Sequence, residues 1–248
     1  MPSPPEAAPA SSLQVIAMHG WAGDGLGWDL LRQALAAPDW HWQCGERGYG
    51  GRTPDRPQWA PGGRRLLIGH SMGPHLLPPS LLAQAEAVVL LASFARFLPP
   101  GREGRRLQTA LAGMAAQLAE GPDESDTARR AQRMLQAFLE KAASPDPPEL
   151  LPHGPASQPV GPEGRRRLRD DLERLAACAD LPPGFPTDVP VLIVEAGADR
   201  IVGPEARALL RERLPHAEVL HFEGAGHCLL QAPLPAELRR WITGTLGP

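Results

Sequence analysis

The chain has 248 residues, enough for one α/β domain with a buried core and a modest insert. Its formal net charge of −3 gives no reason to expect nucleic acid as a partner, and no apolar run approaches membrane-spanning length. The first 12 residues are rich in proline, alanine and serine, without a basic start or an apolar segment. We therefore expect a disordered tail rather than a secretory signal, and a protein of the reducing cytoplasm.

The first predicted strand covers Leu13–Met18 and runs into the loop His19-Gly20-Trp21-Ala22-Gly23. A helical pattern follows from Trp28 to Ala36, and a second strand is predicted around His41. The next stretch, from Gly50 to Gly63, contains three prolines and no apolar periodicity. A helix is excluded there, so we expect a loop to cover one face of the sheet, with Trp59 as its anchor.

A short strand that ends in Gly-x-Ser-x-Gly is the strongest functional signal. Leu66-Leu67-Ile68 runs directly into Gly69-His70-Ser71-Met72-Gly73. This junction is typical of a nucleophile elbow, a sharp strand-to-helix turn that holds the serine hydroxyl above the edge of a sheet. The glycines let strand and helix approach closely while Ser71 takes a strained conformation. Because the chain has 26 glycines, the motif alone is equally consistent with a structural turn.

The elbow is followed by a predicted helix, a strand and a helical insert. Pro74 is tolerated in a first helical turn, and the helix is expected from Leu76 to Ala85. A fourth strand ends near Leu91. From residue 96 to 185 the pattern is helical, which predicts a cap that excludes water and shapes an acyl pocket. The predicted domains are a core of residues 1–95 and 186–248 and a helical cap of residues 96–185.

A serine hydroxyl needs a base to take its proton and a carboxylate to orient that base. Val189–Val194 is a buried-type parallel strand, and the following loop places Asp199 beyond its carboxyl end. Glu195, at the end of that strand, is the alternative acid, although Asp199 has the more usual position. A helix is then predicted from Pro204 to Leu214.

The base follows in the required order. A last strand around Val219–Phe222 leads to Gly224-Ala225-Gly226-His227, whose glycines let the loop carry His227 back towards Ser71. A tetrahedral intermediate also needs two preorganised donors, for which the backbone N–H groups of Trp21 and Met72 are the candidates. Together these motifs predict a working Ser-His-Asp hydrolase site.

With these motifs in order, the chain resembles the α/β-hydrolase family over nearly its whole length. The resemblance implies a mostly parallel sheet flanked by helices, with Ser71 as nucleophile, His227 as general base and then acid, and Asp199 as its orienter. More narrowly, the chain is similar to the pimeloyl-ACP methyl ester carboxylesterases of biotin synthesis. This similarity rests on the entry His19-Gly20-Trp21, the run Leu91–Phe97 and the arginine-rich insert. It implies an acyl carrier protein as partner.

Two sets of residues are candidates for binding substrate. The acyl channel candidates are apolar residues, for which plain core is the alternative: Trp21, Phe94, Phe97, Met114 and Phe138. The second set suits an acidic carrier protein or its phosphopantetheine phosphate, although acidic residues in the insert also fit a solvated charged face. Its members are the arginines Arg129, Arg130, Arg133, Arg165, Arg166 and Arg169.

No cofactor or metal is expected, because no histidine pair has metal-ligand spacing with accompanying carboxylates. The three cysteines are too scattered for a disulfide framework, and Cys228, beside His227, is interpreted as a packing residue. The sequence thus predicts an ester hydrolase acting on the methyl ester of pimeloyl-ACP. A generic short-acyl esterase, thioesterase or lactonase, acting on a small molecule, is the nearest alternative. A non-catalytic hydrolase-fold binding protein is the other class, but such proteins usually lose a triad member.

Overall fold

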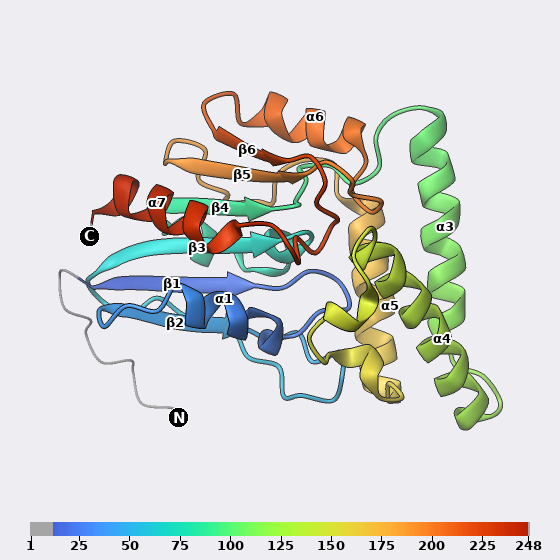
Figure 1. The fold of residues 1–248 in the computed structure, drawn as a ribbon. Helices are drawn as coiled ribbons and strands as arrows, with labels where there is room; N and C mark the ends of the chain where they lie inside the picture. Colours follow the sequence, from blue (N-terminus) through green and yellow to red (C-terminus); the bar gives the residue numbers. More distant parts are fainter. Residues whose placement is uncertain (1–11, 248) are drawn as a thin grey trace.

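The computed structural model describes residues 12–247, and the predicted tail falls almost entirely outside them. Its centre is a six-stranded sheet in which every neighbouring pair is parallel, with the order β2-β1-β3-β4-β5-β6 (Figure 1). The strands are β1 (Leu13–Met18), β2 (Trp40–Gly45), β3 (Arg64–His70), β4 (Ala87–Leu91), β5 (Val191–Ala196) and β6 (Glu218–Phe222). The predicted parallel sheet flanked by helices is confirmed.

The two faces of the sheet are covered by different elements, as the alternation of side chains along the strands requires. On one face, Val15, Leu66 and Ile68 pack with α1 (Asp29–Ala34) and α7 (Leu234–Leu246). On the other face, Ile16 and Leu67 pack with α2 (Pro79–Leu82) and α6 (Pro204–Arg213). Both faces of the central strands are therefore buried, which explains their continuous apolar runs.

A loop replaces a helix between β2 and β3, as the prolines predict. Trp59 packs against the second face, and its indole N–H donates to the carbonyl of Leu81 at 2.9 Å. The Gln14 amide bonds both backbone groups of Ala60, at 2.7 and 3.1 Å, and the Gln43 amide holds Gln58. These side chains give the loop the backbone partners that a helix would have supplied internally.

The helix predicted from Leu76 to Ala85 is wrong. The chain forms a 3₁₀ turn, η2 (Gly73–Leu76), and then the single-turn helix α2. Pro78 and Pro79 are the physical reason, because proline lacks a backbone N–H and forces an extended conformation on the preceding residue. The helix predicted from Trp28 is likewise shorter, since Gly25–Trp28 is a 3₁₀ turn and α1 ends at Ala34.

Three long helices between β4 and β5 match the helical pattern of the insert. They are α3 (Arg102–Leu118), α4 (Glu124–Ala143) and α5 (Pro162–Ala177), and they lie beyond the carboxyl ends of the strands (Figure 1). Their apolar faces meet in a hydrophobic cluster that also contains Trp21 and Met72. Within residues 12–247, no helix combines the length and hydropathy needed to cross a membrane.

Candidate active site

Ser71 occupies a sharp turn between β3 and η2, with a left-handed φ of 54°. Its N–H donates to the carbonyl of Leu91 at 2.8 Å, and its own carbonyl accepts from the Ser93 hydroxyl at 2.7 Å. A side chain at Gly73 would collide with the carbonyl of Met18. The elbow therefore depends on glycine for space and on the residues after β4 for its strained backbone.

His227 and Asp199 form a buried pair near this elbow. The imidazole Nδ1 donates to Oδ2 of Asp199 at 2.8 Å, and the two side chains are 3% and 0% exposed. The other carboxylate oxygen accepts the N–H groups of Ile201 and Val202, at 2.7 and 3.0 Å. Burial alone would raise the pKa of Asp199, but His227 and these hydrogen bonds together lower it. Because Nδ1 carries the proton in this bond, Nε2 is left as the basic atom of the neutral imidazole.

The residue before the serine links the two halves of the site. His70 Nε2 lies 3.0 Å from the carbonyl oxygen of His227, and the two rings are 4.8 Å apart. Burial lowers the pKa of His70 to about 4, so the ring donates this hydrogen bond while neutral. Within residues 12–247, the Ser71 hydroxyl makes no hydrogen bond of its own. Serine–histidine bonds of this kind commonly tighten only in the complex with substrate.

The loop after β1 packs directly on the serine. A Cβ at Gly20 would lie 2.8 Å from Cβ and 3.3 Å from Oγ of Ser71. His19 fixes this loop, since Nδ1 donates to the carbonyl of Gly20 at 2.8 Å and Nε2 accepts the N–H of Arg47 at 3.1 Å. Neither Trp21 N–H nor Met72 N–H donates to another group in the described part of the chain. Both proposed oxyanion donors are thus unused by the fold.

The same loop is tied to the cap. The indole N–H of Trp21 donates to the carbonyl of Leu168 in α5 at 2.8 Å, and its ring meets Phe138 of α4 edge-on at 4.8 Å. The Leu168 contact could not be predicted from the sequence, because a carbonyl acceptor on a distant helix leaves no residue-type signature. The packing of α5 therefore helps to position the loop after β1, which carries the proposed oxyanion donor Trp21.

A second contact between cap and core was also not predicted. Asp171 of α5 is fully buried and accepts three hydrogen bonds from the loop after β2. The donors are Arg47 Nε and Nη2, at 2.6 and 2.8 Å, and the Tyr49 hydroxyl at 2.7 Å. The arginine charge compensates the buried carboxylate, so this cluster holds α5 against the core.

A cavity of about 490 Å³ opens beside His227. Of the predicted acyl-channel residues, Trp21 and Phe138 line it, whereas Phe94, Phe97 and Met114 do not. Phe94 stacks on His75 at 5.0 Å and packs edge-on against Phe97, and both phenylalanines are almost fully buried. The two phenylalanines therefore do not line this cavity, and they fill the junction of sheet and cap instead.

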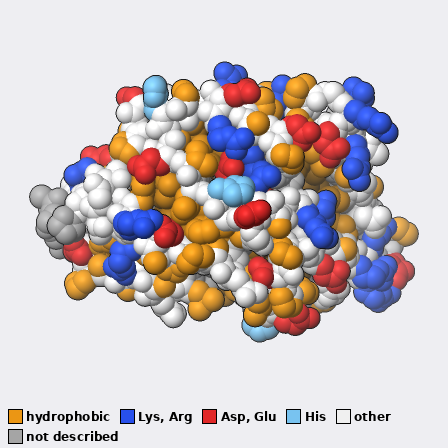
Figure 2. Space-filling view, turned by 45° about the horizontal axis from the view of Figure 1, so that its top comes forward, with side chains coloured by type: hydrophobic (Ala, Val, Ile, Leu, Met, Phe, Trp, Pro, Cys, Tyr) orange, Lys and Arg blue, Asp and Glu red, His pale blue; other side chains and the backbone are white. Residues whose placement is uncertain are grey.

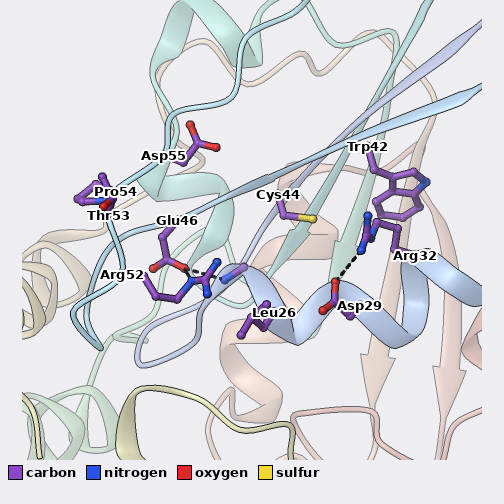
Figure 3. Close-up of a pocket in the computed structure, with 11 residues that line it drawn as sticks. Leu26, Asp29, Arg32, Trp42, Cys44, Glu46, Arg52, Thr53, Pro54 and Asp55 are labelled. Carbon is purple, nitrogen blue, oxygen red and sulfur yellow. Dashed lines mark hydrogen bonds and ion pairs between the residues drawn. The ribbon is translucent and has the colours of Figure 1, made fainter. Parts of the chain in front are cut away.

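A larger hollow of about 710 Å³ lies at the outer edge of β2 and contains none of the three proposed catalytic residues (Figure 3). Trp42 and Cys44 point into it from the strand, and its two arginines are paired with carboxylates at 3.0 Å, Arg32 with Asp29 and Arg52 with Glu46. Size alone is thus a poor guide to the site, and the smaller cavity beside His227 is the candidate active site.

No protein-family model matches the chain, and no curated protein matches its sequence. Solved structures do match. An esterase from Exiguobacterium antarcticum is 15% identical, covers 97% of this chain and 94% of that one, and has a TM-score of 0.68. The enol-lactonase from Burkholderia xenovorans is 17% identical, with 98% and 95% covered and a TM-score of 0.67. An alpha/beta hydrolase fold protein from Nakamurella multipartita is 20% identical, with 96% and 93% covered and a TM-score of 0.55. The chain has the α/β-hydrolase fold.

Within this fold, the arginines proposed to dock a carrier protein have different surroundings. Arg165 is only 1% exposed and is held by Glu124 at 2.6 and 2.9 Å and by the carbonyl of Val160 at 2.8 Å, so its assignment to a docking surface is wrong. Arg130 donates to the carbonyls of Gln117 and Ala119 at the end of α3. Of the remaining four on α4 and α5, three are exposed, Arg129, Arg133 and Arg166, and Arg169 is half-buried. Figure 2 shows basic and acidic side chains interspersed at this end of the molecule.

The alternative acid of the candidate site points elsewhere. Glu195 is paired with Arg211 and lies 3.4 Å from His221 on β6. Cys228 lines the cavity, and burial followed by the charge of Asp199 raises the pKa of its thiol to about 12. It is therefore a neutral thiol at pH 7 rather than a nucleophile. Within the described residues, no group of three His, Cys, Asp or Glu side chains could hold a metal ion.

Proposed function

We propose that the protein is a carboxylic ester hydrolase that acts through Ser71. The observation that carries this proposal is the buried Asp199–His227 hydrogen bond, which lies next to an elbow serine and two unused backbone donors. The fold of solved esterases and a lactonase is consistent with it, but the assignment rests on the site because fold does not imply function.

The residues have separate roles in the proposed reaction. Nε2 of His227 takes the hydroxyl proton while Ser71 Oγ forms a bond to the ester carbonyl carbon. The N–H groups of Trp21 and Met72 stabilise the resulting oxyanion, and Asp199 stabilises the imidazolium. The intermediate then expels the alcohol, which takes the proton from His227. Water attacks the acyl-enzyme in the same way, which releases the carboxylic acid and restores Ser71.

The test compares wild type with Ser71→Ala on p-nitrophenyl acetate. We expect the variant to lose a factor on the order of 10³ or more in kcat, leaving the contribution of binding and of the oxyanion donors. Ser80→Ala, at an exposed serine of α2, is the matched control and should behave like wild type. Equal turnover by wild type and the Ser71 variant would refute the assignment.

We propose the methyl ester of pimeloyl-ACP as the natural substrate. The entry His19-Gly20-Trp21 supports this choice, as do the arginines Arg129, Arg133, Arg166 and Arg169. A small acyl ester, thioester or lactone is the alternative within the same chemistry. Complementation of a biotin auxotroph that lacks its pimeloyl esterase separates the two, with the Ser71→Ala gene as negative control. Growth with wild type alone supports the carrier-bound ester, whereas no growth despite esterase activity in extracts points to a small substrate.

A further inference from the structure

The cavity beside His227 has apolar walls drawn from several separate parts of the chain. They come from the loop after β1, α1, the end of α4 and the loops around residues 150–155 and 227–235. The large apolar side chains that matter here are Leu30, Leu31, Leu139, Leu151, Leu229 and Phe138. No lysine or arginine lines this cavity. Its walls can therefore remove apolar surface from water but cannot neutralise a negative charge.

Most polar side chains of the walls are already used by the fold, and the exception is the Trp28 indole N–H, which is buried without a hydrogen-bond partner in the described part of the chain. Asp24, the only carboxylate among the lining residues, accepts the N–H groups of Leu26 and Gly27 at 3.0 and 3.2 Å. His19 is buried, His70 is partly buried, and both are hydrogen-bonded to backbone carbonyls. Of the four lining histidines, only His153 is exposed, and it lies on the outer loop. The cavity therefore offers a bound group no lysine or arginine charge.

The cavity is lined by His227 and the loop that packs on Ser71, and also by side chains that are exposed to solvent. Gly20, whose backbone packs on Ser71, and His227 both line it. At the far end, Leu30 and Leu150 line it while remaining 73% and 48% exposed. Large apolar side chains on both sides of an opening let an apolar chain leave the cavity without losing all its contacts.

We propose that this cavity holds the acyl chain of an ester bound at Ser71 and selects linear apolar acyl groups over those that end in a carboxylate. The inference rests on the proposed esterase function and names the substrate class of that site. A terminal carboxylate would be drawn from water into walls without a cation, which is strongly unfavourable. A longer chain, or one whose far end is a neutral thioester, passes out between Leu30 and Leu150.

The kinetic test uses p-nitrophenyl acetate, p-nitrophenyl octanoate and the mono-p-nitrophenyl ester of octanedioic acid at pH 8. Each methylene buried in the transition state is worth about fourfold, so kcat/KM should rise at least tenfold from acetate to octanoate. The octanedioate ester has the same number of acyl carbons and should be hydrolysed at least tenfold less efficiently than octanoate. Equal kcat/KM for the two eight-carbon esters would overturn the inference while leaving the esterase assignment intact.

Charge substitution at the opening tests the location of the cavity. Leu30→Arg and Leu150→Arg each place a cation where the chain end leaves, and both positions are exposed, so folding is not at stake. At least one should raise the octanedioate-to-octanoate ratio of kcat/KM threefold or more. Val219→Arg adds the same charge at an exposed site on β6 that does not line the cavity, and should keep the wild-type ratio. An unchanged ratio in both leucine variants would place the acyl chain elsewhere.

A binding measurement separates failure of this inference from failure of the esterase proposal. Trp21 and Trp28 line the cavity, so a bound chain should change tryptophan emission. With the Ser71→Ala protein, methyl octanoate should bind at least tenfold more tightly than methyl hydrogen octanedioate at pH 8. If wild type hydrolyses none of the esters but the difference in affinity persists, the cavity assignment is supported and the esterase proposal is refuted. If binding is equal for the two, the cavity assignment is refuted whatever the turnover.

Discussion

The acid that orients His227 can be identified by two substitutions of equal size. In Asp199→Asn the imidazole would lose the carboxylate that fixes its tautomer, and we expect kcat to fall roughly 10⁴-fold. In Glu195→Gln we expect little change, because Glu195 is bonded to Arg211 rather than to His227. Circular dichroism of both variants checks the fold, and ester turnover gives the ranking. The reverse ranking would transfer the role of the acid to Glu195.

Single residues differ in how much of their environment the sequence reveals. Asp199 and His227 follow their strands at the sheet edge, so topology alone brings them together, as the 2.8 Å hydrogen bond shows. Arg165 lies in a run of three arginines, and nothing in that run distinguishes the buried member. Its burial is decided by Val160 and Glu124, which come from elsewhere in the cap. Residue type therefore predicts the chemistry of a side chain, while packing decides whether that side chain is accessible.

At the scale of elements, strands and long helices follow from local pattern, and the short connections do not. The six strands and the three helices of the insert have strong periodicity, and the structure contains all of them. After the elbow the apolar residues at Leu76, Leu81 and Leu82 suggest a continuous helix, yet two prolines leave only a single turn. The contact of α5 with the loop after β2 depends on Asp171, which the local sequence does not distinguish from Asp170.

The cluster around Asp171 gives a prediction about how α5 is held to the core. Arg47→Met removes the cation that hydrogen-bonds the fully buried Asp171 carboxylate and leaves only the more exposed Arg174, 3.8 Å away, so it should cost about 3–5 kcal/mol in the free energy of unfolding. Adding Asp171→Leu removes that buried charge, so the double variant should be more stable than Arg47→Met alone. Urea unfolding measures the free energy of unfolding of the single and the double variant.

The matched control for this cluster is Arg166→Met, which removes an exposed ion pair with Glu163 on the same helix and should change stability by under about 1 kcal/mol. If the double variant is no more stable than Arg47→Met, the loss comes from packing of the arginine side chain rather than from the unpaired charge.

At the scale of the whole molecule, three buried or partly buried histidines make the fold sensitive to acid. His19, His70 and His75 lie in or beside the candidate site, and burial is the main cause of the lowered pKa of each. A histidine with a lowered pKa binds its proton more readily in the unfolded chain. The free energy of unfolding therefore falls as the pH drops below 6.5. Asp24 acts in the opposite direction, because burial raises its pKa and the folded state then takes up the proton first.

For His70 the pH window is defined, since its pKa falls from the ordinary 6.5 to about 4 in the folded protein. Its contribution to stability is complete above pH 6.5 and is lost by pH 4, by an amount of about 3 kcal/mol. His70→Gln keeps a donor for the carbonyl of His227 but cannot take up a proton, so its stability should decline less between these pH values. Urea unfolding of wild type and variant at pH 7, 5.5 and 4.5 measures the difference in slope. His153→Gln, at an exposed position, should follow the wild-type slope. Parallel slopes for wild type and His70→Gln would show that His70 is protonated in the folded state, and the neutral contact that links the elbow to His227 would have to be abandoned.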